Sequence, residues 1–283
     1  MTQPISCSCA DSCCGRFARL FRRLEAAREG AFVPFVNLCD PTPDASLEIL
    51  ETLAANGADA LELGIPFSDP CADGPVIAAS AHRALQAGST TAKCLEVVRR
   101  FRAKHPDTPI SLMLYINLAF APGLEKFFAD CAAAGADAVL IADLPASMRD
   151  VVREFDAAAA KAGIELISLV PPSATPEHVR KIAPHAQGYT YLLSRAGITG
   201  TDKAAGTPAH EVLAILREEG AAPGLLGFGV STPEHVRKAL ASGAAGVIVG
   251  SAIVRIITEH VNDMASLKDS LGAYVRSMKD ATR

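Results

Sequence analysis

Several features are absent from this sequence, and each absence excludes a class of protein. No apolar run approaches the roughly 20 residues that a membrane-spanning helix needs, and the N-terminus lacks the hydrophobic core of a signal peptide. Basic residues are not in excess either, because the formal net charge is −4 and the sequence pI is about 6.0. A charge balance of this kind gives no electrostatic footprint for nucleic acid or an anionic membrane surface. We therefore expect a cytoplasmic protein whose ligand is a small molecule.

Two kinds of catalytic machinery are also missing. No group of histidines and cysteines has the spacing of a metal site. Ser68 and Cys71 have no histidine in the same loop that could activate them as nucleophiles. Four histidines fall in or at the starts of segments with helical periodicity, where surface or capping roles are expected: His82, His178, His210 and His235. The sequence predicts neither a metal site nor a histidine-activated nucleophile.

Cysteine is distributed unevenly along the chain. Four of the eight cysteines lie within the first fourteen residues, at Cys7, Cys9, Cys13 and Cys14. Their spacing matches no zinc pattern and no histidine lies nearby, so residues 1–15 are predicted to be a flexible extension, with a soft-metal site as the alternative. The others are scattered, as small core or loop residues are in a reducing compartment: Cys39, Cys71, Cys94 and Cys131.

Strand-like and helix-like segments alternate through the rest of the chain. Short apolar runs bounded by turn residues predict eight strands, at 33–38, 60–64, 110–116, 138–144, 165–170, 188–194, 224–230 and 246–251. Helical periodicity occurs between them, at 43–56, 123–134, 147–162, 233–242 and 252–279. The sequences NGADALELG, AGADAVLIAD and SGAAGVIVG repeat one order of helix stop, small-residue turn and buried strand. Each repeat indicates an αβ unit.

Nearly continuous apolar strands that alternate with helices indicate parallel strands covered by helices. Eight such units in about 250 residues predict a (β/α)8 TIM barrel, with residues 16–283 as a single domain. The segment RFARLFRRLEAAREG places Phe17, Leu20, Phe21 and Leu24 on one face, so an extra N-terminal helix, ended by Gly30, should cover one end of the barrel. An open doubly wound sheet is the alternative, but NLCDPTPD after the first strand lacks the glycine-rich turn of a dinucleotide site.

The stretch LELGIPFSDPCADGP carries two acids at the end of the second predicted strand. Glu62 shares a strand face with Ala60 and Gly64, while Leu61 and Leu63 occupy the other face. An acid among small and apolar neighbours has a raised pKa, which suits it to give and accept a proton. The loop that follows brings Asp73 back toward Glu62. An ordinary salt-bridged acid at a strand end is the alternative for Glu62 alone.

Function in such barrels lies at the carboxyl ends of the strands. Gly229 allows a close backbone approach, and Gly250 and Ser251 offer free N–H groups and a hydroxyl at the start of a helix, which predicts a phosphate site after the last two strands. Residues 191–208 are polar and long enough to form a lid. An apolar, partly aromatic ring should line the barrel mouth beside Glu62: Phe35, Met113, Leu140, Ala142, Tyr191, Phe228 and Ile248. Together these features suggest proton-driven C–C or C–N chemistry on an aromatic phosphate ester.

The acid-bearing stretch at 61–75 resembles the signature loop of the tryptophan synthase alpha chain family. YLLSRAGITG, GFGVSTPEHV and AGVIVGSAIV resemble three further segments of that family, in the same order and at matching spacing, and the likeness extends from about residue 17 to 283. The resemblance implies a barrel lyase of L-tryptophan biosynthesis that cleaves indole-3-glycerol phosphate to indole and glyceraldehyde 3-phosphate by a retro-aldol reaction.

The resemblance also implies roles for individual residues. Glu62 would be the general acid and base that protonates indole C3, and Asp73 would stabilise positive charge at the indole N–H. Thr199 would close the lid toward Asp73. The indole would lie against Tyr191, Phe228, Phe35, Leu140, Ala142 and Ile248, and the phosphate against Gly200, Gly229, Gly250 and Ser251.

A partner follows from the same resemblance, which implies an α2β2 heterotetramer with a beta chain that carries pyridoxal phosphate, while this chain carries no cofactor. Asp69, Pro70 and Asn117 match positions that face the beta chain. Asn37, Cys39 and Cys71 depart from the threonine, glycine and leucine that are more usual in the family. Two alternatives remain: a stand-alone indole-releasing lyase, and a weakly active subunit that mainly activates a beta-type partner.

Overall fold

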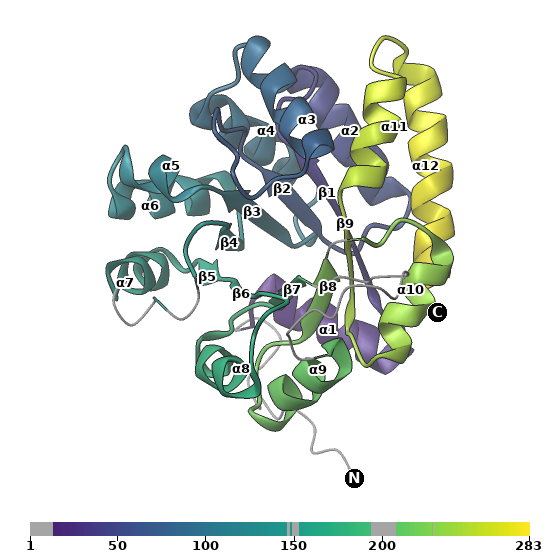
Figure 1. Ribbon diagram of the computed structural model, residues 1–283. Helices are drawn as coiled ribbons and strands as arrows, with labels where there is room; N and C mark the ends of the chain where they lie inside the picture. The colour runs from purple at the N-terminus through teal and green to yellow at the C-terminus, as the bar shows by residue number, and fades with distance from the viewer. Residues whose placement is uncertain (1–13, 146–147, 149–152, 194–207, 228) are drawn as a thin grey trace.

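The computed structural model describes residues 14–145, 148, 153–193, 208–227 and 229–283. Its sheet contains nine parallel strand segments in the order β5-β4-β3-β2-β1-β9-β8-β7-β6, as Figure 1 shows. The segments are β1 (Ala31–Asn37), β2 (Leu61–Gly64), β3 (Ile110–Leu114), β4 (Ala138–Ile141), β5 (Glu165–Leu166), β6 (Ser168–Val170), β7 (Thr190–Leu193), β8 (Gly224–Gly227) and β9 (Gly246–Val249).

The two outermost segments of this order, β5 and β6, belong to one continuous stretch of chain. Only Ile167 separates them, and its N–H still donates to Val139 O of β4 at 2.9 Å. β5 pairs with β4 and β6 pairs with β7, so this stretch joins the two edges of the sheet. Counted as one strand, it gives the eight-stranded parallel barrel that the sequence predicts.

Helices surround the barrel and follow its strands in chain order (Figure 1). Their bounds are α1 (Arg16–Ala27), α2 (Pro43–Ala55), α3 (Pro75–Gln86), α4 (Thr91–Lys104), α5 (Ile116–Phe120), α6 (Leu124–Ala134), α7 (Arg153–Ala162), α8 (Pro176–Ile182), α9 (Ala209–Glu218), α10 (Pro233–Ala241), α11 (Ser251–Glu259) and α12 (Met264–Asp280). No described helix combines the length and the apolar character that crossing a bilayer requires.

Threonine caps explain where several of these helices begin. The side-chain oxygens of Thr42, Thr90, Thr175 and Thr232 accept the backbone N–H three residues further on. In three of the four cases proline follows the threonine, and its fixed φ suits the first helical position. The capped N–H groups of α8 and α10 belong to His178 and His235, so both histidines lie at helix starts as expected, but the threonines provide these caps.

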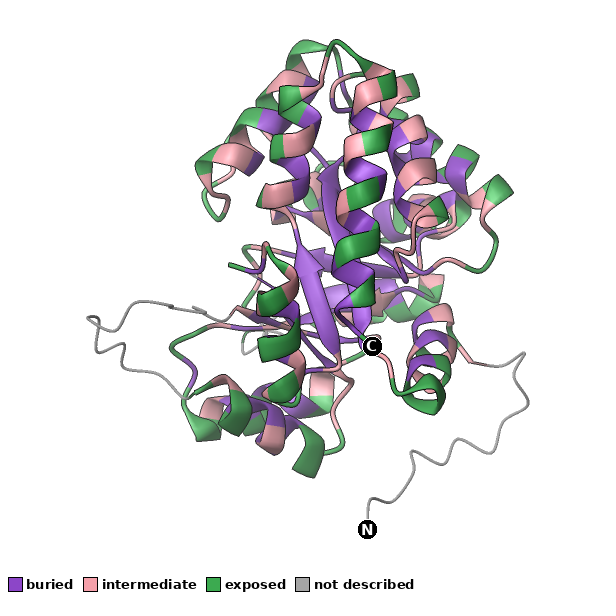
Figure 2. Cartoon of the chain, turned by 90° about the vertical axis from the view of Figure 1, so that its right-hand side faces the viewer, coloured by how far each residue is buried: buried purple, intermediate pink, exposed green. Residues whose placement is uncertain are grey.

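Strand side chains divide between two apolar regions. Figure 2 shows buried strands beneath helices whose outer faces are exposed. Leu61 and Leu63 belong to the region between the strands and the surrounding helices. Ala60 belongs to the region inside the barrel, and Glu62 hydrogen-bonds Tyr189 of that inner region. The alternation predicted for this strand is confirmed, and it points the acid inward.

The N-terminal helix α1 closes the end of the barrel where the strands begin. Phe17, Leu20 and Leu24 are buried, and the Phe17 ring lies 5.2 Å from the ring of Tyr189. Arg16 also pairs with Asp137, just before β4, at 2.7 Å. The predicted helix and its role as a cover are confirmed, but it ends at Ala27 rather than at Gly30, because Arg28 adopts the left-handed conformation with φ of 58°.

Several predicted strands extend past the observed strand ends, among them the one expected at 246–251, which ends at Val249 because Ser251 already opens α11. Most of the first part of one predicted helix lies outside the described residues. The strand expected at 110–116 ends at Leu114, and Ile116 instead opens the short helix α5, where its N–H donates to Asp143 Oδ1 at 2.7 Å. The strand expected at 138–144 ends at Ile141, because Leu144 N turns back to Ile141 O at 3.2 Å. The helix expected at 147–162 is described only from Arg153 to Ala162.

Candidate active site

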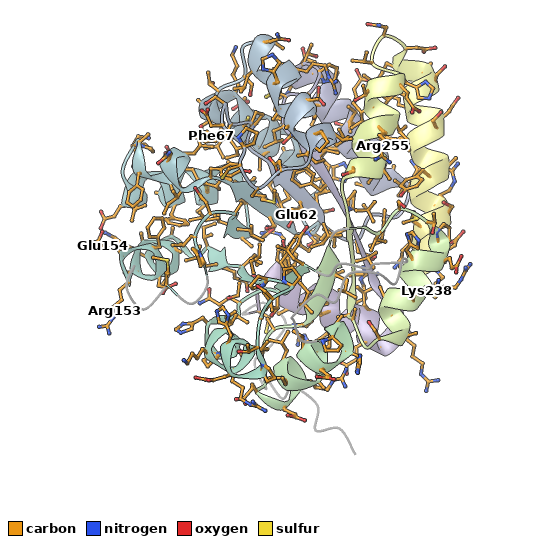
Figure 3. All side chains as sticks on the ribbon, viewed as in Figure 1. Glu62, Phe67, Arg153, Glu154, Lys238 and Arg255 are labelled. Carbon is orange, nitrogen blue, oxygen red and sulfur yellow. The ribbon has the colours of Figure 1, made fainter. Side chains whose placement is uncertain are left out.

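Glu62 lies inside the barrel, two residues before the end of β2. It pairs in register with Phe35 of β1 and with Ser111 of β3, and its exposed fraction is 0%. Figure 3 shows its position near the centre of the barrel, in contrast to the outward side chains of Arg153, Lys238 and Arg255. The Tyr189 hydroxyl donates to Glu62 Oε1 at 2.7 Å and lies 3.1 Å from Ser111 Oγ. The acid is therefore oriented through one of its two oxygens.

The second oxygen of this carboxyl group has a different environment. Glu62 Oε2 is buried, and it accepts no hydrogen bond from the residues that the structure describes. Burial without compensation raises the pKa of Glu62 from 4.5 to about 7, although the Tyr189 hydrogen bond acts in the opposite direction. A carboxyl group that titrates near neutrality can donate and accept a proton at physiological pH.

Asp73 lies in the loop between β2 and α3, where Tyr115 holds the backbone. The Tyr115 hydroxyl accepts the Ala72 N–H at 2.9 Å, and the Tyr115 ring stacks on Phe67 at 5.2 Å. Burial raises the pKa of Asp73, and a hydrogen bond from Tyr115 partly offsets this rise. Both candidate acids therefore have raised pKa values and tyrosine partners.

Tyr191 links the two acids electrostatically. Its pKa is raised first by burial and then by the charges of Glu62 and Asp73. Most of the predicted apolar ring gathers around this position: Phe35, Leu140 and Ile248 are buried together, with Met113, Ala142 and Tyr191 packed against them. The structure thus brings the predicted apolar wall and the two acids to the same part of the barrel.

The start of α11 forms the next part of the site. Gly250 is its N-cap and Ser251 its first residue, so the N–H groups of the first helical turn have no partner within the helix. A side chain at Gly250 would contact Phe35 at 3.2 Å and Ile77 at 3.6 Å, which places the helix start beside the apolar wall. Gly229 is exposed and has a φ of 80°, a conformation that favours glycine. These positions fit the predicted anion site.

Some predicted site residues cannot be placed. Thr199 and Gly200, together with most of the predicted lid, and Phe228 of the apolar ring lie outside the described residues. The N-terminal extension also lies outside them, except for Cys14 and Gly15. Within the described part of the chain, no three His, Cys, Asp or Glu side chains come together as ligands for a metal ion.

Three residues that orient the acids were not predicted: Tyr189 and Tyr115, which are partners of the acids, and Ser111, which contacts the Tyr189 hydroxyl. The period of two that placed Tyr191 inside the barrel also places Tyr189 inside, one layer deeper. Ser111 shares a face with Met113 in the same way, so a signal for both residues was present. The bond from Tyr115 to the Asp73 loop had no comparable signal, because it depends on the conformation of that loop.

The three positions that were expected to depart from the family pattern lie in different surroundings. Asn37 and Cys39 are buried at the end of β1, and Cys39 has a φ of 63°, a value at which glycine would be unstrained. Its Sγ lies 3.8 Å from the Sγ of Cys94. Cys71 is exposed in the Asp73 loop, so the thiol does not fill the core.

The fold and the buried carboxyl group inside it are those of a (β/α)8-barrel enzyme. A model of the tryptophan synthase alpha chain family matches residues 21–283. The chain belongs to this family. It is therefore an indole-3-glycerol phosphate lyase, the alpha subunit that acts with a beta chain in L-tryptophan biosynthesis.

Relatives agree along nearly the whole length of the chain. The tryptophan synthase alpha chain of Photobacterium profundum is 50% identical over 268 residues, which cover 95% of this chain and 98% of the relative. The tryptophan synthase alpha chain of Shewanella oneidensis is 51% identical over 267 residues, which cover 94% of this chain and 95% of the relative. The subunit alpha structure from Legionella pneumophila has a TM-score of 0.84 at 32% identity, covering 95% and 98%. A tryptophan synthase structure from M. tuberculosis has a TM-score of 0.81 at 27% identity, covering 95% and 100%.

Proposed function

We propose that Glu62 is the general acid and base of the lyase reaction. In its protonated form it donates a proton to C3 of the indole ring, and the carboxylate that remains can accept the proton of the hydroxyl next to the breaking C–C bond. The hydroxyl carbon becomes the aldehyde of glyceraldehyde 3-phosphate and the ring leaves as indole, so the proton count of Glu62 is restored. The observation that carries this proposal is the buried Glu62 carboxyl group with a pKa of about 7 and an unbonded Oε2.

Asp73 supplies a negative charge that acts on the indole ring. Protonation at C3 places positive charge on the indole ring, and a carboxylate beside the ring N–H stabilises that charge. Because the charge exists only along the reaction path, Asp73 lowers the barrier more than it tightens substrate binding. Support comes from Tyr191, whose pKa is raised, after burial, by the charges of both Glu62 and Asp73.

The remaining parts of the site hold the substrate. The indole ring lies against the apolar wall, with Phe35, Leu140, Ala142, Tyr191, Phe228 and Ile248 as its lining. The phosphate accepts hydrogen bonds from the backbone N–H groups of Gly250 and Ser251, where the N-terminal end of α11 favours an anion. It also accepts a hydrogen bond from the N–H of Gly229. Gly200 completes this cradle, and Thr199 closes over the site toward Asp73.

The partner contact follows from the same loop. Asp69 and Asn117 are exposed and Pro70 is half-buried, all near the Tyr115 side of the Asp73 loop, so a beta chain seated there would affect Asp73 directly. The assembly is an α2β2 heterotetramer in which pyridoxal phosphate belongs to the beta chain and this chain carries no cofactor. From the biosynthetic role we infer a cytoplasmic enzyme.

The test follows indole release from indole-3-glycerol phosphate by the purified chain, alone and with a beta chain, in H2O and in D2O. We expect one indole for each glyceraldehyde 3-phosphate, faster turnover with the beta chain, and one deuterium at indole C3 in D2O. Equal turnover with and without the beta chain would indicate a stand-alone lyase. No turnover under either condition would leave a subunit that only activates its partner.

A further inference from the structure

Four buried or partly buried polar side chains connect the end of β1 to α3. Asn37 is the last residue of β1 and is 5% exposed, and its Nδ2 donates to Ile77 O at 3.0 Å and to Ser80 Oγ at 3.1 Å. Ser80 is fully buried, and its hydroxyl donates to Asp40 Oδ2 at 2.5 Å. Arg83 donates to both oxygens of Asp40, at 2.6 and 2.7 Å. The groups of α3 that take part belong to Ile77, Ser80 and Arg83, which recur every three residues along one face of the helix.

This network fixes α3 more sharply than apolar packing would. An apolar helix face can slide by a fraction of an ångström at little cost, whereas buried hydrogen bonds lose their full value when their geometry changes. Both N–H donors of the Asn37 carboxamide are used, and its Oδ1 lies over Gly64, where a Cβ atom would clash with it. Arg83 also donates to Thr258 Oγ1 of α11 at 3.2 Å, so the two neighbouring helices are held together.

The face that is held in this way lies next to the site. α3 begins at Pro75 with Gly74 as its N-cap, and Ala78 N donates to Gly74 O at 2.9 Å, so Asp73 lies two residues before the start of a helix that is locked in place. The Ile77 side chain lies beside Gly250 and belongs to the same apolar region as Phe35. A shift of α3 would therefore move Asp73 and disturb the wall next to the anion site.

We propose that Asn37 is a positioning residue for the lyase reaction, which acts through Ser80 and α3 to hold the Asp73 carboxyl group in its reactive place. Asn37 does not touch the reacting atoms. The inference rests on the role proposed for Asp73, and it assigns a purpose to a position at which the chain departs from its family. Tyr115 holds the loop from the β3 side, and Asn37 holds the helix that follows the loop from the β1 side.

The experiment measures kcat, KM and thermal unfolding for Asn37→Ala and Ser80→Ala, in the presence of a beta chain. Misplacing a catalytic group by about 1 Å can cost about 100-fold in rate, so we expect Asn37→Ala to lower kcat by about 10 to 100-fold, with KM within about twofold of wild type. Ser80→Ala, which leaves one carboxamide bond, should lower kcat by at least about threefold. Asn56→Ala is the matched control, because its Nδ2 donates to Thr52 O at 2.8 Å at the far end of α2, and its kcat should not change.

A double-mutant cycle separates positioning from general damage. In an Asp73→Asn background, Asn37→Ala should lower kcat by less than about threefold, because the group that it positions is already gone. Equal losses in both backgrounds, or a wild-type kcat for Asn37→Ala, would overturn the proposal. If Asn37→Ala does not fold, Ser80→Ala in the two backgrounds decides in the same way. A wild-type kcat for Asp73→Asn would instead overturn the proposed role of Asp73.

Discussion

Burial of Glu62 makes a quantitative prediction about stability. The folded-state pKa of about 7 lies above the ordinary value of 4.5, so the folded protein binds more protons than the unfolded chain between these pH values. Stability should therefore fall as pH rises through this window, and the carboxylate exerts its full cost above pH 7. A rise of about 2.5 pKa units corresponds to about 3 kcal/mol, at about 1.4 kcal/mol for each unit.

The variant Glu62→Gln removes this titration while keeping the shape of the side chain. Relative to wild type, it should gain up to about 3 kcal/mol in the free energy of unfolding between pH 4.5 and pH 8. The assay is urea unfolding followed by circular dichroism at several pH values for both proteins. The quantity compared is the difference in the free energy of unfolding between Glu62→Gln and wild type at pH 8, minus the same difference at pH 4.5. A pH-independent effect of the amide cancels in this comparison, and so do the contributions of the other titrating groups.

Glu165 provides the matched control, because burial also raises its pKa to about 7, but at the start of β5, near the end of the barrel that α1 covers. Glu165→Gln should change the pH dependence in the same direction. If the stability of Glu62→Gln ran parallel to that of wild type from pH 4.5 to pH 8, Glu62 would not be the buried acid that the structure shows, and the reasoning would fail.

Two further predictions concern substrate turnover. Tyr189→Phe removes a hydrogen bond that lowers the pKa of Glu62, and a bond to a charged group contributes about 1.5 to 3 kcal/mol. Because Glu62 reacts first in its protonated form, the alkaline limb of the pH profile of kcat/KM should move about one to two units toward alkaline pH, and an unmoved limb would disconnect Tyr189 from the reacting acid. Ser251→Asp should raise KM, because the new carboxylate repels the phosphate. Tm should stay equal or rise, since an acid at the start of a helix is favourable. An unchanged KM would show that the phosphate binds elsewhere.

The local pattern of apolar and polar residues was sufficient to predict the strands and helices that repeat along the chain. Alternation in the second strand predicted that Glu62 points inward, because small residues share its face, and the same alternation predicted the buried wall of Phe35, Leu140 and Ile248. The amphipathic face of α1 predicted a buried helix, but not its last residue. That end depends on the left-handed conformation of Arg28, which a non-glycine residue seldom adopts.

Contacts between distant segments could not be predicted in this way. The hydrogen bond from Tyr189 to Glu62 spans 127 residues, and the bonds from Asn37 to α3 span 40 and 43. The first bond depends on the barrel being closed, and the bonds from Asn37 depend on the rotation of α3 about its axis. Sequence spacing fixes neither property, so it identified the acids but not the groups that orient them.

The most direct test of the account compares indole release by Glu62→Gln and Glu165→Gln with wild type, at saturating indole-3-glycerol phosphate and in the presence of a beta chain. Positioned acid–base catalysis typically contributes about 100 to 10,000-fold, so Glu62→Gln should lose at least about 100-fold in kcat while Glu165→Gln stays within about twofold of wild type. Near-normal turnover by a folded Glu62→Gln protein would contradict the claim that the buried carboxyl group inside the barrel transfers the proton.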